Sequence, residues 1–228
     1  ILCLTLSIAA AGERFNLEHA AKIVNVLNPQ ISPDGKSVVV VVSRANLKDN
    51  RYDTELVQVD VATKSQKILT RRRASQQKWS PDGTKLAFLA PVDGKAQIFV
   101  LPIDGGEAIQ VTKAPTAVQG YEWRPDGKAF AYTAPEEPPK VDGDEKANKS
   151  FDADVNYLLT EAPKPSHLWS ISAEGGESKR LTSGTWSIGG DSYWSPDGKR
   201  LALEAQPGPG ARVWSERASK VLDVEPGK

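Results

Sequence analysis

The sequence predicts an all-β fold, a β-propeller of four-stranded blades, and three observations support this expectation. A Pro-Asp-Gly motif occurs four times, at Pro33, Pro81, Pro125 and Pro196. The first two spacings between these prolines, 48 and 44 residues, match the length of known propeller repeats, roughly 40–50 residues. Between the motifs, apolar runs of strand length flank glycine-rich turns. Repeated strands joined by tight turns are typical of propeller blades.

Each copy of the motif has the chemistry of a tight turn. Its proline presets φ at the first corner, its aspartate accepts hydrogen bonds from nearby amides, and its glycine accepts positive φ. Apolar residues two apart follow the turn and predict a strand with one packed face; they are Leu86 and Phe88, Phe130 and Tyr132, Leu201 and Leu203. Trp79, Trp123 and Trp194 precede three of the turns, and we expect them to fill the wedges between blades.

A second hairpin is expected in each blade. The run 98–103 leads into the turn Asp104-Gly105-Gly106-Glu107 and then into 109–112, and the segments 168–182 and 56–70 follow the same plan. Two hairpins make four strands. The blades are therefore expected at about 29–70, 76–112 and 119–182, with a fourth from about 191 toward 224. About four blades barely close a ring, so the propeller is expected to be either a minimal ring or incomplete.

The segments outside the blades suggest other roles. Residues 1–11 form an apolar run that includes Cys3 and ends in small residues, which is typical of a signal-peptide remnant whose start is missing. A buried first strand or helix is the alternative. Residues 12–28 are expected to form a short helix, capped by Asn16 and continuing to Leu27, ahead of blades spanning 29–228. An insert at about 134–166 carries five prolines and a charged run, which predicts an extended surface loop.

Charge and composition argue against several classes of site. The 29 basic residues balance 29 acidic ones, so no net charge favours nucleic acid. The only histidines are His19 and His167, so a histidine base or metal site has little material, and we expect no cofactor and no metal. The recurring Asp34, Asp82, Asp126 and Asp197 could suggest a calcium array, but turn chemistry already explains them.

Other matches to catalytic or binding motifs are weak. The segment 184–189 is one residue too long for a Gly-x-Ser-x-Gly nucleophile turn and is interpreted as a loop between blades. Segment 35–37 ends like a phosphate loop without its first glycine. The arginines at 71–73 are expected to be solvated, and Asn148 begins a glycosylation sequon. We therefore expect no catalytic residue in this chain.

Glu136 and Glu137, in the insert, are the candidate substrate-binding residues. Paired carboxylates could bind the amine of a substrate. The alternative is that both are simply solvated in a proline-rich loop.

Three stretches of the chain resemble exported prolyl oligopeptidase family peptidases, the bacterial dipeptidyl aminopeptidase and acylaminoacyl-peptidase group. They are the opening 28–38, the segment 50–56, and the end of the insert with its following strand, 154–169. The resemblance extends over residues 15–224, although the blade motif is shared with TolB-like propellers. It implies an N-terminal propeller paired with a C-terminal α/β-hydrolase domain that bears the catalytic triad, none of which lies in this chain.

The resemblance implies a non-catalytic role for this chain. The propeller would gate access and select short peptides for a serine peptidase, which is exported to the periplasm or secreted after signal cleavage and is not held in the membrane. The alternative is a stand-alone periplasmic TolB-like propeller that binds protein partners without catalysis. An unclosed propeller exposes strand edges, so the chain alone is also expected to aggregate.

Overall fold

Four antiparallel sheets, arranged in chain order, make up the protein. The computed structural model describes residues 16, 19, 22–137, 164–208 and 217–224. Blade 1 contains β1 (Val24–Ile31), β2 (Ser37–Asn46), β3 (Arg51–Asp60) and β4 (Gln66–Thr70). Blade 2 contains β5 (Ser75–Trp79), β6 (Lys85–Val92), β7 (Lys95–Pro102) and β8 (Ile109–Gln110). The prediction of four-stranded blades is confirmed for these two.

Blades 3 and 4 continue the plan with one difference. Blade 3 contains β9 (Gly120–Trp123), β10 (Ala129–Pro135), β11 (Ser166–Ser172) and β12 (Lys179–Arg180). Blade 4 contains three strands among the described residues, namely β13 (Ser187–Trp194), β14 (Arg200–Gln206) and β15 (Ala218–Asp223). The connection from β10 to β11 carries the insert, most of which lies outside the described residues.

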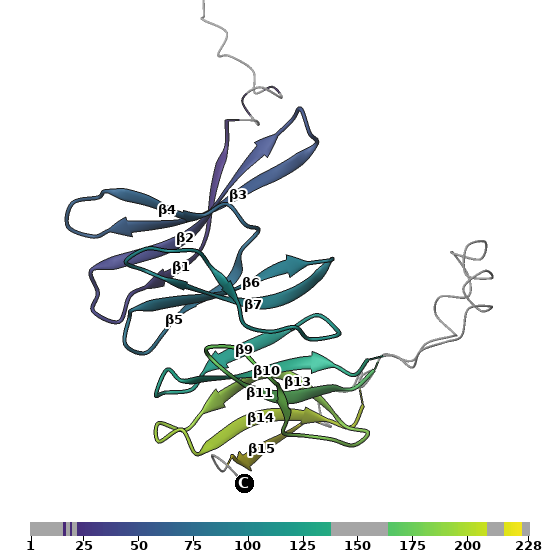
Figure 1. Cartoon of the computed structure of the whole chain (residues 1–228). Coiled ribbons are helices and arrows are strands. Elements are labelled where there is room, and N and C mark those ends of the chain that lie inside the picture. The colour runs from purple at the N-terminus through teal and green to yellow at the C-terminus, as the bar shows by residue number, and fades with distance from the viewer. Residues whose placement is uncertain (1–15, 17–18, 20–21, 138–163, 209–216, 225–228) are drawn as a thin grey trace, which may run out of the picture.

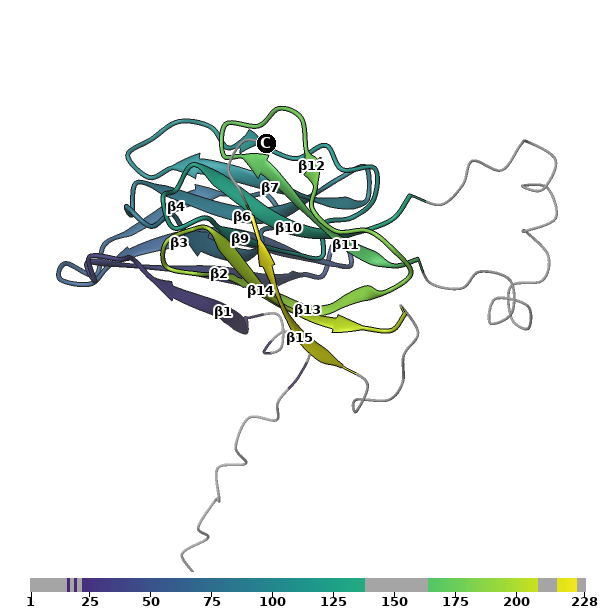
Figure 2. The same ribbon diagram turned by 90° about the horizontal axis from the view of Figure 1, so that it is seen from below.

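The blades stack face to face around a common inner edge. Within each sheet every strand pairs with the next one in the chain, and the first strands of successive blades contact one another (β1 with β5, β5 with β9, β9 with β13). Figure 1 shows blade 1, in purple and blue, at one end of the stack and blade 4, in yellow-green, at the other. Figure 2 gives the view from below, in which blade 4 lies over the other blades. The described part is thus an open arc of propeller blades.

The expected helix over 12–28 is wrong for its second half. Residues from Val24 onward form β1, which pairs with β2 from Val24↔Arg44 to Ile31↔Val38. Pro29 cannot donate an intrahelical hydrogen bond, and Val24 and Val26 favour a strand. Among the described residues of this segment, Asn16 Oδ1 accepts a hydrogen bond from the His19 amide at 3.0 Å. Residues 1–11 lie outside the described residues.

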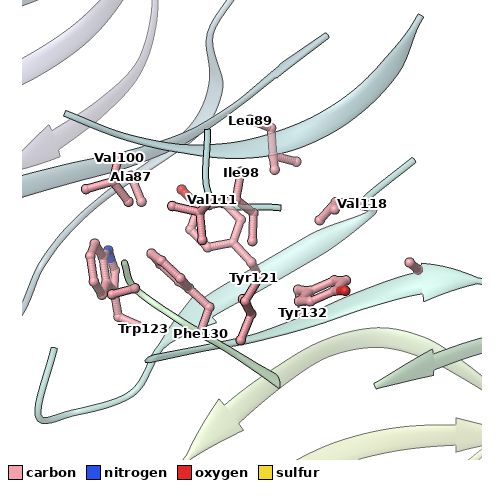
Figure 3. Packing of buried hydrophobic residues seen from close by; sticks show 13 residues of the cluster. Ala87, Leu89, Ile98, Val100, Val111, Val118, Tyr121, Trp123, Phe130 and Tyr132 are labelled. Atoms are coloured by element: carbon pink, nitrogen blue, oxygen red, sulfur yellow. The ribbon is translucent and has the colours of Figure 1, made fainter. Parts of the chain in front are cut away.

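The interfaces between blades form the core. Between blades 2 and 3, Trp123, Tyr121 and Phe130 pack against Ala87, Ile98 and Val100, as Figure 3 shows. The Trp123 and Phe130 ring centroids lie 4.1 Å apart. Trp79 and Trp194 pack in the same way at the other two interfaces. The prediction that these tryptophans fill the wedges between blades is confirmed.

The Pro-Asp-Gly turns form one row at one end of the blades, the turn end. In blade 2, Asp82 Oδ1 accepts hydrogen bonds from the Ser80 hydroxyl at 2.6 Å and from the Thr84 amide at 3.0 Å. A Cβ at Gly83 would lie 3.4 Å from Pro33 Cδ of the preceding turn, and Gly83 has a φ of +73°. That distance is an ordinary van der Waals contact, so the glycine is needed for its backbone angle.

One face of blade 4 is exposed, whereas the equivalent faces of blades 2 and 3 are buried against the next blade. Ala202 occupies the repeat position of Ala87 and Ala131, both of which have 0% exposure because the next blade covers them. Ala202 is instead exposed. It lies between Tyr193 and Val221 in a cross-strand row, and these are 60% and 68% exposed. This Tyr193–Ala202–Val221 row is an uncovered blade-packing surface.

Candidate functional site at the junction of blades 3 and 4

The two ends of the blades differ in regularity. The turn end repeats one motif, whereas the opposite end, here called the insert end, carries hairpins of different lengths and the insert. The insert leaves after Pro135 and returns at Ser166, and these two residues are paired across β10 and β11. Loops of variable length on rigid blades are where binding sites usually lie. The sequence-predicted acids, Glu136 and Glu137, also lie at this end.

Glu136 is engaged by neighbouring side chains at the root of the insert. Its Oε1 accepts a hydrogen bond from Arg180 Nη2 at 2.5 Å and lies 3.4 Å from His167 Nε2. Its backbone amide donates to the Pro165 carbonyl at 2.9 Å. Glu137 is exposed. The structure therefore separates the two acids into one held by an arginine and one facing solvent.

His167 is a buried histidine next to Glu136, where the insert leaves blade 3. It has 0% exposure, its Nδ1 lies 3.2 Å from Thr182 Oγ1, and its ring meets that of Trp186 edge-on at 6.1 Å. Burial lowers the pKa of His167, and the nearby Arg180 lowers it further, while Glu136 and the Gly184 carbonyl partly oppose the shift. A neutral imidazole at neutral pH follows from this environment.

The remaining sequence candidates have structural partners. Ser187 lies in strand β13, where its hydroxyl accepts a hydrogen bond from the Ser166 amide at 2.9 Å, and no nucleophile turn is formed there. Arg71 pairs with Glu55 at 3.0 Å, and Arg72 lies over the Phe99 ring. Asn148 lies outside the described residues. Within the described ranges no group of three metal-ligating side chains occurs, and no helix is long and apolar enough to span a membrane.

The larger of two surface hollows lies along the β2–β3 hairpin of blade 1. It measures about 1030 Å³. Glu55 binds Arg44 and Arg71, and Asp53 binds Arg51. The lining holds five basic side chains against these two acids, so this hollow keeps an excess of positive charge.

The second hollow lies between blades 3 and 4 at the insert end. It measures about 570 Å³ and has a mostly polar lining that includes Gln119, Thr133, Lys164, Ser187, Gln206 and Arg217. Gly189, Gly190 and Asp191 of β13 form one wall. The sequence reasoning missed this hollow, although the glycine pair was a signal, since glycine inside a strand often marks a bulge or a close approach.

Comparisons with known proteins support the fold. A family model described as the TolB beta propeller domain matches residues 10–162. The "Uncharacterized peptidase YuxL" of Bacillus subtilis is 32% identical over 217 residues, which is 89% of this chain and 32% of that protein. Dipeptidyl-peptidase 5 of Porphyromonas endodontalis is 37% identical over 106 residues, which is 46% of this chain and 15% of that protein. The chain thus spans a third or less of the length of these curated relatives.

Solved structures show the same architecture. An acylaminoacyl peptidase of Pyrococcus horikoshii superposes with a TM-score of 0.57 at 22% identity, covering 81% of this chain and 28% of that one. TolB of Acinetobacter baumannii superposes with a TM-score of 0.54 at 18% identity, covering 87% of this chain and 41% of that one. These identities establish the fold alone. The family match over residues 10–162, two thirds of the chain, shows that the chain belongs to the TolB-like β-propeller family.

Proposed function

We propose that this chain is the substrate-gating propeller portion of an exported serine peptidase that acts on short peptides. The observation that carries the proposal is the contrast between the two ends of the blades. The turn end is a regular row of tight turns, while the insert end gathers the insert, the exposed Glu137 and the polar hollow. A rigid arc with one specialised end is suited to admit and orient a ligand from that end.

The relatives support a peptidase in preference to a stand-alone propeller. The curated proteins that match are named as peptidases, and each is at least three times as long as the matched region. A longer gene product would supply the hydrolase domain and its catalytic triad. The propeller would then contribute by exclusion, since a narrow entry admits short chains and blocks folded proteins. Export would depend on the apolar segment 1–11.

The test compares this chain with the complete gene product. Both are assayed on aminoacyl and dipeptidyl nitroanilides, and on one peptide sequence offered either free or within a folded protein. We expect no turnover by this chain. We expect the complete product to hydrolyse the free peptide and to leave the same sequence within the folded protein intact. Turnover by this chain would overturn the assignment of a non-catalytic part. An inactive complete product that binds a defined periplasmic protein would support the TolB-like alternative instead.

Glu137 supplies a sharper test of substrate recognition. Glu136 is held by Arg180, so Glu137 is the acid available for a substrate amine. In the complete product, Glu137→Gln should raise KM for peptides with a free N-terminal amine and leave KM for N-acetylated peptides unchanged. Glu107→Gln, an exposed acid of the β7–β8 turn, is the matched control. Equal KM changes for both kinds of peptide would contradict the proposed amine contact.

A further inference from the structure

The first three blades are joined at their inner strands by a repeated pair of hydrogen bonds. Trp79 Nε1 donates to the Gln30 carbonyl of the preceding blade, and Trp123 Nε1 donates to the Lys78 carbonyl, both at 3.2 Å. Two residues earlier in each inner strand, Gln77 and Tyr121 donate to the carbonyls of residues 28 and 76. These bonds close the inner edge of the first two interfaces.

The junction of blades 3 and 4 lacks both bonds. Trp194 Nε1 is buried and has no hydrogen-bond partner among the described residues. The residue in the position of Tyr121 is Ser192, whose side chain is too short to reproduce the tyrosine's bond. The polar hollow of about 570 Å³ opens at this same junction. Its size lies within the range of about 300–1,000 Å³ that is typical of ligand sites.

One wall of the hollow presents bare main chain. Ile188 pairs with Ala205 and Ser192 pairs with Leu203, so the three residues 189–191 lie opposite Glu204 alone. This bulge leaves peptide groups of β13 without ladder partners in β14. Two of the three residues are glycines, so these peptide groups are not covered by side chains of their own. The wall can therefore offer amide donors and carbonyl acceptors to a ligand.

Both glycines lie against polar side chains of β14. A Cβ on Gly189 would lie 2.7 Å from Gln206 Oε1, and a Cβ on Gly190 would lie 3.0 Å from Glu204 Oε2. The opposite oxygen of Glu204 is held by Arg217 at 3.0 Å. The Gln206 carboxamide has no hydrogen bond to any residue that the structure describes. It carries both a donor and an acceptor, and it lies against Gly189 of β13.

We propose that this hollow binds a short extended peptide through its main chain. An extended peptide presents alternating N–H and C=O groups, which the Gln206 carboxamide and the peptide groups at 189–191 can pair. Recognition through the main chain tolerates many side chains, in keeping with a gate that admits varied short peptides. The inference rests on the proposed function for its biological meaning. Peptide binding itself requires neither hydrolysis nor the remainder of the gene product.

The test is direct peptide binding to this chain. Tri-alanine is titrated by isothermal calorimetry and by saturation-transfer NMR, and tri-sarcosine, whose backbone nitrogens are methylated, is the comparison ligand. We expect tri-alanine to bind at least about tenfold more tightly than tri-sarcosine. Tri-sarcosine lacks the two main-chain N–H donors of tri-alanine, and each donor is expected to contribute about fivefold in affinity. Gln206→Ala should weaken tri-alanine binding about fivefold. Gln66→Ala, an exposed glutamine of β4, is the matched control and should leave binding unchanged.

The outcomes separate the two proposals. Gly190→Ala serves as a second variant, since its methyl group displaces the flexible end of Glu204 and should also weaken binding. Circular dichroism of each variant verifies the fold. Absent binding of tri-alanine, equal binding of tri-sarcosine, or unaltered binding by folded Gln206→Ala and Gly190→Ala would overturn the inference. None of these results bears on whether the complete product hydrolyses peptides, and an inactive complete product would leave the binding result intact.

Discussion

Replacing each motif tryptophan by phenylalanine should have unequal effects on stability. Trp123 is 6% exposed, and its Nε1 donates a bond of 3.2 Å to the Lys78 carbonyl. Loss of this hydrogen bond lowers the free energy of unfolding by about 1 kcal/mol, and by about 1–3 kcal/mol if the buried carbonyl is left without a partner. Trp194 Nε1 is buried without a partner among the described residues, so Trp194→Phe removes a group that is already unsatisfied. Trp123 is also more deeply buried than Trp194, so the smaller ring costs Trp123→Phe more packing as well.

The free energy of unfolding should therefore fall by at least about 1 kcal/mol more for Trp123→Phe than for Trp194→Phe. The loss of unfolding free energy for Trp79→Phe should lie between these two losses, because the bond from Trp79 to the Gln30 carbonyl is more exposed. The measurement is urea unfolding followed by far-UV circular dichroism. Trp169→Phe is the matched control, since its Nε1 is also buried without a described partner, and it should behave like Trp194→Phe. Equal losses for Trp123→Phe and Trp194→Phe would refute the reasoning.

Three further perturbations test other parts of the structure. The Ser80 hydroxyl and the Thr84 amide lower the pKa of Asp82 below 3.8, so its stabilisation is present above about pH 4 and is lost as pH falls through the folded pKa. Asp82→Asn should therefore lower the urea midpoint near pH 7, and its difference from wild type should shrink as pH falls below about 4, whereas a constant difference would contradict this origin. Phe130→Ala should cost about 3–5 kcal/mol in urea unfolding, because Phe130 has 0% exposure, and a loss below about 1 kcal/mol would contradict its core role. Val221→Lys should reduce self-association in analytical ultracentrifugation, while Ile109→Lys, equally apolar and 60% exposed on β8, should not.

Much of the blade could be predicted because its signals are local. The turn chemistry of Asp82 depends on a few neighbouring residues, and the structure confirms it. The alternation of Phe130 and Tyr132 correctly predicted a strand, but the single packed face was wrong, because β10 is buried on both faces between neighbouring blades. The error at Val24–Leu27 arose because apolar residues there fit a helical stripe as well as a strand. Pairing with β2 decided between the two, and that pairing is not visible in a short window of sequence.

The candidate site was harder to predict because it depends on contacts between blades. Glu136 could be singled out as an acid, but its bond to Arg180, 44 positions away, could not. The hollow at the junction of blades 3 and 4 is lined by the bulge at 189–191, which depends on the register between β13 and β14. The sequence shows Trp194 as one more copy of the motif tryptophan. Only the inner-strand geometry distinguishes it from Trp123.

The Tyr193–Ala202–Val221 row has a consequence for how stability is distributed along the chain. Blades 2 and 3 have a neighbour on both faces, whereas the described blades 1 and 4 are covered on one face only. In a stack where each unit contacts only its neighbours, opening can begin at an end unit without disturbing the middle. Amide hydrogens of β14 should therefore exchange faster than those of β6 and β10. The protein would then behave as a one-dimensional lattice that frays from its ends, and any segment that covers this row would slow exchange throughout blade 4.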